Sequence, residues 1–498
     1  MLERVWQLLV SLFAGGLFLG LIFAGTGQDH SASANTGQPA PVVPASLQRD
    51  IDPLQVEGEI MPAFWGFPID ELALYKYDAG AWSPIPFQVD EVDASGAYVT
   101  FEDGLMDAND ELVFMGGDAG SSVLNNNWPD DAASKLHSRY VITATDPLNP
   151  ADQGWVYLYR SPTLPHSNQS YISWDYGQQT LTASSYTLSF DSNFVGFANL
   201  ELNGSGDVLD RQKIRVVNTF GVITEEAIQA PVDLTNIGPV RALGGGGGAL
   251  LNFAFAFYGA RMKIRLGVNM QDIGPIHFDS ARLSLDMLNP ATSEMAPATY
   301  YDSNLATGVP IDGMADNVPP TPPNHWYEVS GAVGSLVHIF DVNPGNGIRT
   351  NYYLDNSSID PDDTGDQRSY GDAGILISAP SPDISIGYVT AAQTTYILPA
   401  AQGNVGQTYT DRAHNPLTAA AAAENYGSDV STPTPGATPS TTATPAPSPT
   451  PTVTSTPTKT PTPTKTPTPT QTPPPSPSPT ITPRPTEWKL YLPALWTN

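Results

Sequence analysis

Apolar and polar side chains alternate along most of the chain between residues 55 and 427. The segment 261–268 reads Arg-Met-Lys-Ile-Arg-Leu-Gly-Val, and the phenylalanines of segment 253–257 are separated by alanines. A period of two places successive side chains on opposite faces of a β-strand. Further segments have the alternation or the β-branched and aromatic composition of strands: 138–145, 155–159, 213–217, 337–342 and 385–390.

Clusters of Gly, Pro, Asn and Asp separate these segments, as is typical of turns. The pattern predicts an all-β body over residues 55–427, a large antiparallel β-sandwich. Its length of about 370 residues allows either one large domain or two closely packed β-domains. Two segments predict something other than strand: the glycine run 244–248 predicts a flexible hairpin loop, and the alanine-rich segment 417–424 predicts a helix.

The N-terminus carries an almost unbroken apolar run from Val5 to Ala24. About 20 apolar residues can cross a bilayer as a helix. The small residues from Ala32 to Ala34 also suit the cleavage site of a secretory signal. We therefore predict a hydrophobic N-terminal helix in residues 1–34, either a signal peptide or a membrane anchor, followed by a linker over 35–54. Both alternatives predict bacterial-type export, with the body at the cell surface or secreted.

The C-terminal part has a different composition. Residues 428–486 are dominated by Thr and Pro, which cannot build a core, so this segment is predicted to be a disordered, extended spacer. An apolar tail, 487–498, follows it and contains Tyr-Leu-Pro. The tail resembles those that follow Thr/Pro spacers on some exported bacterial surface proteins. The cell envelope is then the expected partner of the tail, of the N-terminal helix, or of both; the alternative is a short strand that folds back onto the body.

Charge and composition exclude several classes of protein. Acidic side chains outnumber basic ones 50 to 21 in 498 residues, so the net charge of -29 repels a phosphate backbone and we expect no nucleic-acid partner. The absence of cysteine excludes disulfides, thiolate metal sites and cysteine nucleophiles. The seven histidines form no His-Glu-x-x-His pair, and no nucleophile elbow or phosphate loop is present.

Three segments are the most distinctive of the chain. They read Trp-Ser-Pro-Ile-Pro-Phe-Gln-Val-Asp-Glu at 82–91, Asp-Ala-Asn-Asp-Glu-Leu-Val-Phe at 107–114 and Gly-Pro-Val-Arg at 238–241, and the segment Tyr-Val-Thr-Phe at 98–101 lies between the first two. Together they resemble the sugar-processing β-supersandwich proteins, which are related to galactose mutarotases and exo-acting rhamnogalacturonan lyases. Members of that group carry a Pro-x-Gln-x-Asp element, an Asp-Glu-Leu-Val-Phe strand and a later Gly-Pro-x-Arg turn. The resemblance implies a supersandwich of two large sheets and a carbohydrate ligand, and it transfers no catalytic residue.

Two acidic segments are candidate calcium sites. Crowded carboxylates repel one another unless a cation compensates them, and a set of oxygen ligands alone selects Ca²⁺ over transition metals. The alternative is that these side chains cap turns in solvated loops. The first candidate set is Asp90, Asp107, Asn109 and Glu111; the second is Asp360, Asp362, Asp363 and Asp366.

The scarce basic residues are concentrated between positions 211 and 265. Two Arg-x-Lys-x-Arg segments there each place three cations at alternate positions, which puts the three on one face of a strand. With one further arginine they predict a basic stripe that attracts a polyanion, since the arginine fork suits carboxylates. The alternative is that each cation pairs with a carboxylate of a neighbouring strand. The predicted ligand-binding set is Arg211, Lys213, Arg215, Arg241, Arg261, Lys263 and Arg265.

These observations favour an exported, envelope-associated β-sandwich protein that binds extracellular carbohydrate, with an anionic glycan as the expected ligand. Enzymatic activity is an extension of that hypothesis and would be of the polysaccharide-lyase kind. A lyase needs a base beside a charge-neutralising cation, and His277, Tyr258 and Arg261 are the candidates. The rival hypothesis is a structural or adhesive surface protein without a small-ligand site.

Overall fold

The computed structural model describes residues 43–427, except 95, 191–195, 229–231, 248–250 and 322–324. The expected N-terminal helix, the Thr/Pro spacer and the apolar tail lie outside the described residues. Within the described part of the chain, no helix is long and apolar enough to cross a membrane.

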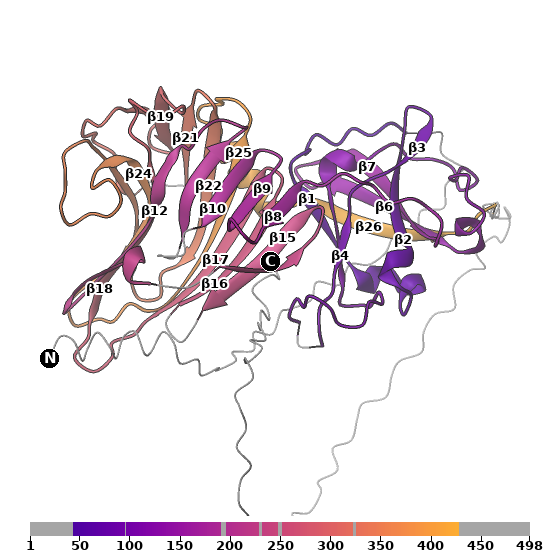
Figure 1. The fold of residues 1–498 in the computed structure, drawn as a ribbon, viewed down its shortest axis with the longest axis horizontal. Coiled ribbons are helices and arrows are strands. Elements are labelled where there is room, and N and C mark those ends of the chain that lie inside the picture. The colour runs from indigo at the N-terminus through magenta and orange to yellow at the C-terminus, as the bar shows by residue number, and fades with distance from the viewer. Residues whose placement is uncertain are drawn as a thin grey trace, which may run out of the picture. The chain divides into compact units, whose positions relative to one another are not determined.

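The body is an all-β sandwich, which confirms the predicted fold class (Figure 1). In the described residues its largest sheet is antiparallel and has nine strands, in the order β14-β15-β16-β17-β25-β22-β21-β19-β20. The strands of this sheet are β14 (Asp233–Ile237), β15 (Arg241–Gly247), β16 (Leu251–Tyr258), β17 (Arg261–Met270), β19 (Ala298–Asp302), β20 (Val309–Ile311), β21 (Trp326–Gly331), β22 (Gly334–Asn343) and β25 (Gly387–Leu398).

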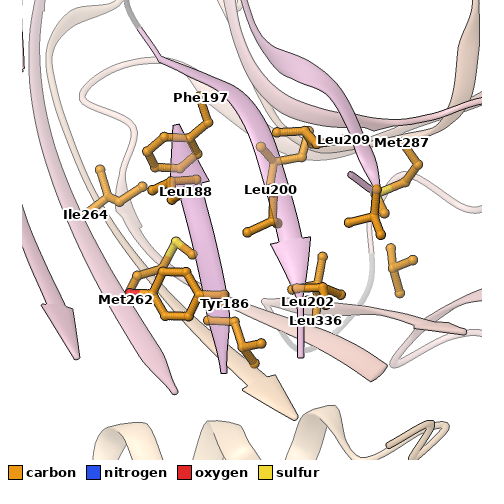
Figure 2. Packing of buried hydrophobic residues seen from close by; sticks show 14 of the residues in the cluster. Tyr186, Leu188, Phe197, Leu200, Leu202, Leu209, Met262, Ile264, Met287 and Leu336 are labelled. Carbon is orange, nitrogen blue, oxygen red and sulfur yellow. The ribbon is translucent and has the colours of Figure 1, made fainter. Parts of the chain in front are cut away.

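Two further sheets share a core with the nine-stranded one. The described strands of the first run in the order β13-β12-β18-β24-β23 and those of the second in the order β11-β10-β9-β8. Apolar side chains from β10 and β11 pack against Met262 and Ile264 of β17 and against Leu209, Met287 and Leu336 (Figure 2). The strands are β8 (Ile172–Asp175), β9 (Thr180–Ala183), β10 (Tyr186–Phe190), β11 (Phe197–Leu202), β12 (Leu209–Asn218), β13 (Gly221–Thr224), β18 (Phe278–Met287), β23 (Ile348–Asn356) and β24 (Ser369–Ser378).

The first part of the chain builds a smaller module with a core of its own, here called the N-terminal module. Its sheets have the strand orders β26-β6-β7-β2-β3 and β1-β5-β4 in the described residues. The last strand, β26, runs among the strands from the beginning of the chain and pairs with β6 (Figure 1). The strands are β1 (Pro53–Glu57), β2 (Leu72–Asp78), β3 (Ala81–Pro84), β4 (Gln88–Asp90), β5 (Glu111–Met115), β6 (Arg139–Asp146), β7 (Asn149–Arg160) and β26 (Thr418–Glu424).

Helical segments are short. Helix α2 (Gly406–His414) packs beside β21 and β22, and Tyr409 and Ala413 lie against the cluster of Trp326 and Tyr396. The 3-10 turns are η1 (Gly58–Ile60), η2 (Pro62–Phe64), η3 (Ile69–Glu71), η4 (Gly116–Asp118), η5 (Ser134–Leu136) and η6 (Glu225–Ala227).

Two local predictions are wrong. The alanine-rich segment is strand β26 and not a helix, because pairing with β6 places Ala419 and Ala421 on the core of the N-terminal module and tertiary packing overrides helix propensity. Most of the glycine run is not a loop, because Gly244–Gly247 pair with β16. A Cβ on Gly246 would stand 2.9 Å from the ring of Phe253, so the aromatic ring takes the place that a side chain would occupy.

The strand alternation follows the sequence pattern closely. On β17, Met262 and Ile264 face the shared core, so Arg261, Lys263 and Arg265 face the opposite side of the sheet. That outer side meets the N-terminal module, where Val113 and Met115 of β5 pack against Leu243, Ala256 and Tyr258 in one apolar cluster. The candidate sites lie along this junction and on the outer face of the sheet β13-β12-β18-β24-β23.

Candidate functional site

The three distinctive sequence segments meet in one buried network at the junction. Arg241, at the start of β15, is 0% exposed and binds the carboxylate of Asp90 on β4 through its Nε at 2.8 Å and that of Glu111 on β5. The Gln88 side chain accepts hydrogen bonds from the backbone N–H groups of Val240 and Arg241 and donates to Asp90. The motif residues therefore tie the N-terminal module to the nine-stranded sheet.

Electrostatics explains why the arginine is needed at this position. Burial raises the pKa of Asp90, and the adjacent Arg241 guanidinium opposes that shift. Burial and the Glu111 carboxylate, which accepts a hydrogen bond from the Tyr98 hydroxyl at 2.8 Å, keep the pKa of Tyr98 well above its ordinary value. The group is a compensated structural network and offers no open coordination position.

This arrangement does not bring the residues of the first candidate calcium set together. Asp90 and Glu111 share the charge of Arg241, which compensates them in place of a metal ion. The side-chain amide of Asn109 donates to the backbone carbonyls of Val92 and Asp93, and the backbone N–H of Asp107 donates to Asp110. The four predicted ligands thus have different neighbours and do not converge on one point.

An open cleft of about 810 Å³ lies beside the network, and the same sequence motif lines it. Phe87, Gln88 and Glu91 form one wall, and the loop that carries Phe101 and Asp103 forms another. The Glu91 carboxylate accepts hydrogen bonds from the backbone N–H groups of residues 102, 103 and 104, so it fixes the loop that presents Phe101.

The lining combines aromatic faces with carboxylates. Phe101 is 72% exposed, and the imidazole of His166 lies edge-on to the ring of Phe87, with 5.9 Å between ring centroids. Asp70 and Asp103 are exposed at the same cleft, whose lining in the described residues includes no lysine or arginine. A cleft of this kind can stack a flat apolar ring face and accept hydrogen bonds from hydroxyl groups.

The seven predicted ligand-binding cations do not form one stripe. The first group, here called the β12 triplet, lies in the sheet β13-β12-β18-β24-β23 and consists of Arg211, Lys213 and Arg215. The second group, the β17 triplet, lies in the nine-stranded sheet and consists of Arg261, Lys263 and Arg265. Each triplet does occupy one face of its strand, as the alternation predicts. Arg241 belongs to the buried junction network. The prediction of one basic stripe is wrong because β12 and β17 pair with different strands and belong to different sheets.

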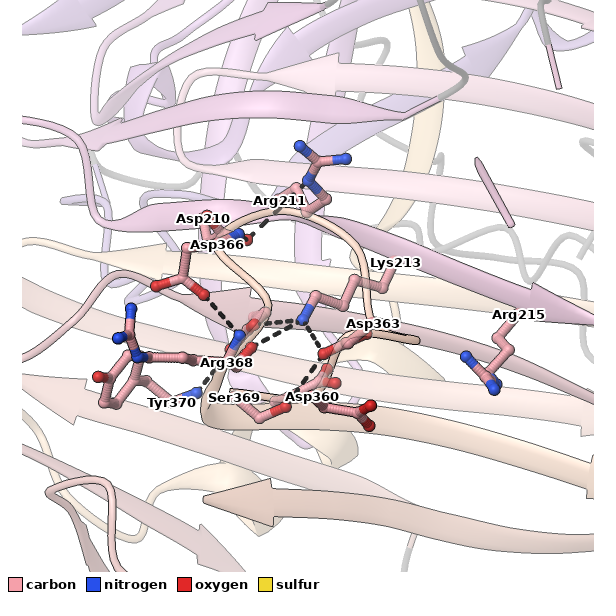
Figure 3. Close-up of polar contacts among 12 residues, drawn as sticks. Asp210, Arg211, Lys213, Arg215, Asp360, Asp363, Asp366, Arg368, Ser369 and Tyr370 are labelled. Atoms are coloured by element: carbon pink, nitrogen blue, oxygen red, sulfur yellow. Dashed lines mark hydrogen bonds and ion pairs between the residues drawn. The ribbon is translucent and has the colours of Figure 1, made fainter. Parts of the chain in front are cut away.

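The β12 triplet is covered by the second predicted calcium loop (Figure 3). Lys213 is 0% exposed and its Nζ lies 2.7 Å from Asp363 of that loop and 2.6 Å from Asp286 of β18. Arg211 pairs with Glu226 at 2.9 Å, and Arg215 donates to the backbone carbonyl of Asp362. Lys213 and Arg211 thus pair with carboxylates from other segments, as in the alternative that the sequence left open, and Arg215 binds only a backbone carbonyl of the acidic loop.

One group of carboxylates within this region has the spacing of a cation site. Oxygens of Asp210, Asp286 and Asp366 lie within 4.8 Å of one another, and of these only Asp366 belongs to the predicted calcium set. Burial and the nearby Asp372 carboxylate raise the pKa of Asp286 well above its ordinary value, while Lys213 opposes the shift. Asp360 and Asp366 accept backbone hydrogen bonds within the loop, from Asp362 and Arg368 respectively. Calcium binding stays a prediction.

The β17 triplet has a different environment. Arg261 and Arg265 are each 8% exposed, Lys263 is partly buried, and Arg261 lies 3.5 Å from the carboxylate of Asp52. Asp52 also pairs with Arg49 at 2.8 Å and accepts a hydrogen bond from Tyr396. Burial, together with Arg265 and Arg261, lowers the pKa of Lys263 to about 7.

The fold brings two of the three catalytic candidates together and leaves the third apart. Tyr258 and Arg261 are paired across β16 and β17, where Tyr258 accepts a hydrogen bond from Arg241. His277 follows the opposite end of β17, about 30 Å away along a ten-residue strand, and its Nδ1 lies 3.0 Å from Asp272. This separation excludes a shared reaction centre for the three side chains.

Sequence reasoning missed the cleft. Asp70, Phe101 and His166 come from three separate loops, so their convergence depends on the fold of the N-terminal module. The available signal was an aromatic residue, Phe101, in an otherwise acidic loop, followed by the carboxylates of Glu102 and Asp103.

Comparisons with known proteins leave the family open. No family model matches the chain, and no curated protein matches it. Among solved structures, the chain is similar to one described as the crystal structure of beta-arabinopyranosidase, with a TM-score of 0.26 and 10% sequence identity. The match covers 47% of this chain and 40% of that chain, so this chain spans less than half of that protein's length. A likeness at this TM-score carries no argument about function.

Proposed function

We propose that the protein is a carbohydrate-binding β-sandwich protein whose cleft beside β4 takes an uncharged sugar. The observation that carries the proposal is the lining: the exposed ring of Phe101 and the Phe87–His166 pair stand beside the carboxylates of Asp70 and Asp103. Sugar rings present apolar faces to aromatic side chains and hydroxyl donors to carboxylates.

The charge of the cleft supports an uncharged ligand and not the anionic glycan expected from the sequence. Asp70, Glu91 and Asp103 repel a uronic acid, and no cation of the described lining compensates them. The proposal keeps the exported, envelope-associated location that residues 1–34 and 428–498 predict. Catalysis is not part of it, because His277 lies away from Tyr258 and Arg261 and none of the three residues lines the cleft.

The test is affinity electrophoresis of the full chain against xylan, galactan and β-glucan, with polygalacturonate as the anionic comparison. We expect retardation by at least one neutral glycan. The Phe101→Ala variant should weaken it about three- to tenfold, since a lost aromatic contact is worth roughly 0.5–1.5 kcal/mol. Tyr176→Ala is the matched control, because Tyr176 is also an exposed aromatic residue, at 64%, and lies outside the cleft.

Two results would overturn the proposal. Retardation that is equal for the parent chain and Phe101→Ala would remove the cleft from sugar binding. Absence of binding to every glycan would favour the rival reading of a structural or adhesive surface protein.

A further inference from the structure

Strand β26 is an edge strand, and its outer side has no partner in the described part of the chain. The order β26-β6-β7-β2-β3 places it at one end of its sheet, where it pairs with β6 over all seven of its residues. No backbone hydrogen bond joins residues 418–424 to another described strand or loop. The outer row of N–H and C=O groups can therefore pair with a further strand.

Other edge strands carry a feature that hinders such pairing, and β26 does not. The edge strands β1, β3 and β20 contain Pro53, Pro84 and Pro310 respectively, and proline cannot donate a hydrogen bond to a neighbouring strand. In contrast, β26 reads Thr-Ala-Ala-Ala-Ala-Ala-Glu. Its one charged side chain, Glu424, is held by Arg139 at 2.7 Å. The edge of β26 therefore has neither a free charge nor a large side chain to keep a second strand away.

The last part of β26 also exposes apolar surface. Strand parity puts Ala419, Ala421 and Ala423 on the core side, and the first two pack on the core of the N-terminal module. Ala423 is nevertheless exposed. Just beyond the strand, the side chain of Tyr426 is 47% exposed, and that of Leu136 on the adjacent turn η5 is 81% exposed. This end of the edge therefore combines unpaired backbone groups with uncovered apolar side chains.

We propose that β26 is a dimerisation edge, to which a second copy of this chain adds its own β26 as an antiparallel strand. The strand is complementary to itself in this arrangement. A two-fold axis at Ala421 sets Ala420 opposite the partner's Ala422 and Glu424 opposite the partner's Thr418, so that no like charges face each other. No β26 residue lines the sugar cleft, and the two proposals stand independently.

The interface is small, so the dimer is expected to be weak and reversible. Seven paired residues on each side are fewer than the roughly 20–30 of a stable interface, and we expect a dissociation constant on the order of 10 µM. Each copy carries a net charge of -29, so two copies repel each other at low ionic strength. Salt screens this repulsion and should strengthen the dimer.

Sedimentation velocity of the full chain over about 1–100 µM is the first test. The parent chain should dimerise, and more tightly at about 0.5 M salt than at about 0.05 M. In Ala422→Lys the dimer should weaken at least about tenfold, because each copy then brings an unpaired charge to the edge. Ala81→Lys is the matched control, since Ala81 is an exposed alanine on β3, the opposite edge of the same sheet. Both positions are exposed, so both variants should keep the thermal midpoint of the parent chain.

Chemical cross-linking gives a second readout that does not depend on disrupting the edge. The chain contains no cysteine, so Ala422→Cys and Ala81→Cys each introduce a single thiol. In the proposed register the two copies of position 422 are diagonal neighbours about 7–8 Å apart. A short bis-maleimide should therefore link two copies of Ala422→Cys several-fold more efficiently than two copies of Ala81→Cys. The proposal is overturned if the parent chain stays monomeric at about 100 µM in both salts, if Ala422→Lys associates as the parent chain does, or if the two thiols cross-link equally.

Discussion

The β12 and β17 triplets have the same Arg-x-Lys-x-Arg sequence and opposite environments. On β12 the central lysine is fully buried between Asp286 and Asp363, and these carboxylates raise its pKa against the effect of burial. On β17 the central lysine has two arginines on its own strand and Ala256 and Thr394 on the neighbouring strands, and its pKa is lowered to about 7. The same sequence pattern therefore places its central lysine between carboxylates in one sheet and between two arginines in the other.

The difference originates in what covers each strand. An acidic loop, 360–366, folds over the outer face of β12, whereas the outer face of β17 meets the N-terminal module and α2, from which few carboxylates reach it. A buried cation beside a carboxylate keeps its charge, whereas a buried cation beside like charges destabilises the fold when it is protonated.

Substitution of the β12 lysine should have the largest effect. Lys213→Met leaves the buried carboxylate of Asp286 without its cation, and breaking a buried ion pair from one side costs about 3–5 kcal/mol. Urea denaturation of the full chain should show a loss of that size in the free energy of unfolding of the body. A loss below about 1 kcal/mol would mean that the loop is not locked by this lysine.

The equivalent change on β17 should act in the opposite direction. The pKa of Lys263 in the folded chain lies below that of an unfolded lysine, about 10.4, so the protonated lysine destabilises the fold fully below pH 7. That penalty disappears as pH rises from 7 through about 10. We therefore expect Lys263→Met to raise the thermal midpoint at pH 6 by several degrees and to bring no gain at pH 10.5. An equal or lower midpoint at pH 6 would show that the charge is compensated after all.

The smallest effects should come from the rim of the β12 triplet. Arg215→Met removes one hydrogen bond to the backbone carbonyl of Asp362, so a change within about 0.5 kcal/mol is expected. Addition of a chelator should leave the thermal midpoint unchanged, because Lys213 and Arg211 already stand beside the carboxylates of the acidic loop and its neighbours. A clear fall of the midpoint on chelation would instead support calcium at Asp210, Asp286 and Asp366.

The sequence was sufficient to locate the strands but not to identify the carboxylates that pair with their cations. Alternation located β16, β17 and β22 and the face that each cation occupies, because side-chain direction in a strand depends only on parity. Whether a cation finds a carboxylate partner depends on residues that are distant in the chain. Asp363 lies 150 positions from Lys213, and Asp90 lies 151 positions from Arg241. No local pattern distinguishes the two triplets.

The same limit applies to the alanine-rich segment and to the cleft. The segment at 417–424 has helical propensity, yet it forms strand β26 because it pairs with the edge of β6 in the N-terminal module. Phe101, Asp70 and His166 meet only because a loop anchored by Glu91 brings one of them to the others. The motif that suggested a sugar ligand contributes Phe87 and Glu91 to that cleft, while its Gln88 and Asp90 serve the junction.

The contrast between the two triplets depends on the lowered pKa of the β17 lysine. The most direct measurement is an NMR pH titration of the full chain with lysine ¹³Cε labels, with the signals of Lys263 and Lys213 assigned by single substitutions. The account predicts a titration of Lys263 near pH 7 and no titration of Lys213 below pH 10. A Lys263 signal that titrates at or above the ordinary lysine pKa would contradict it.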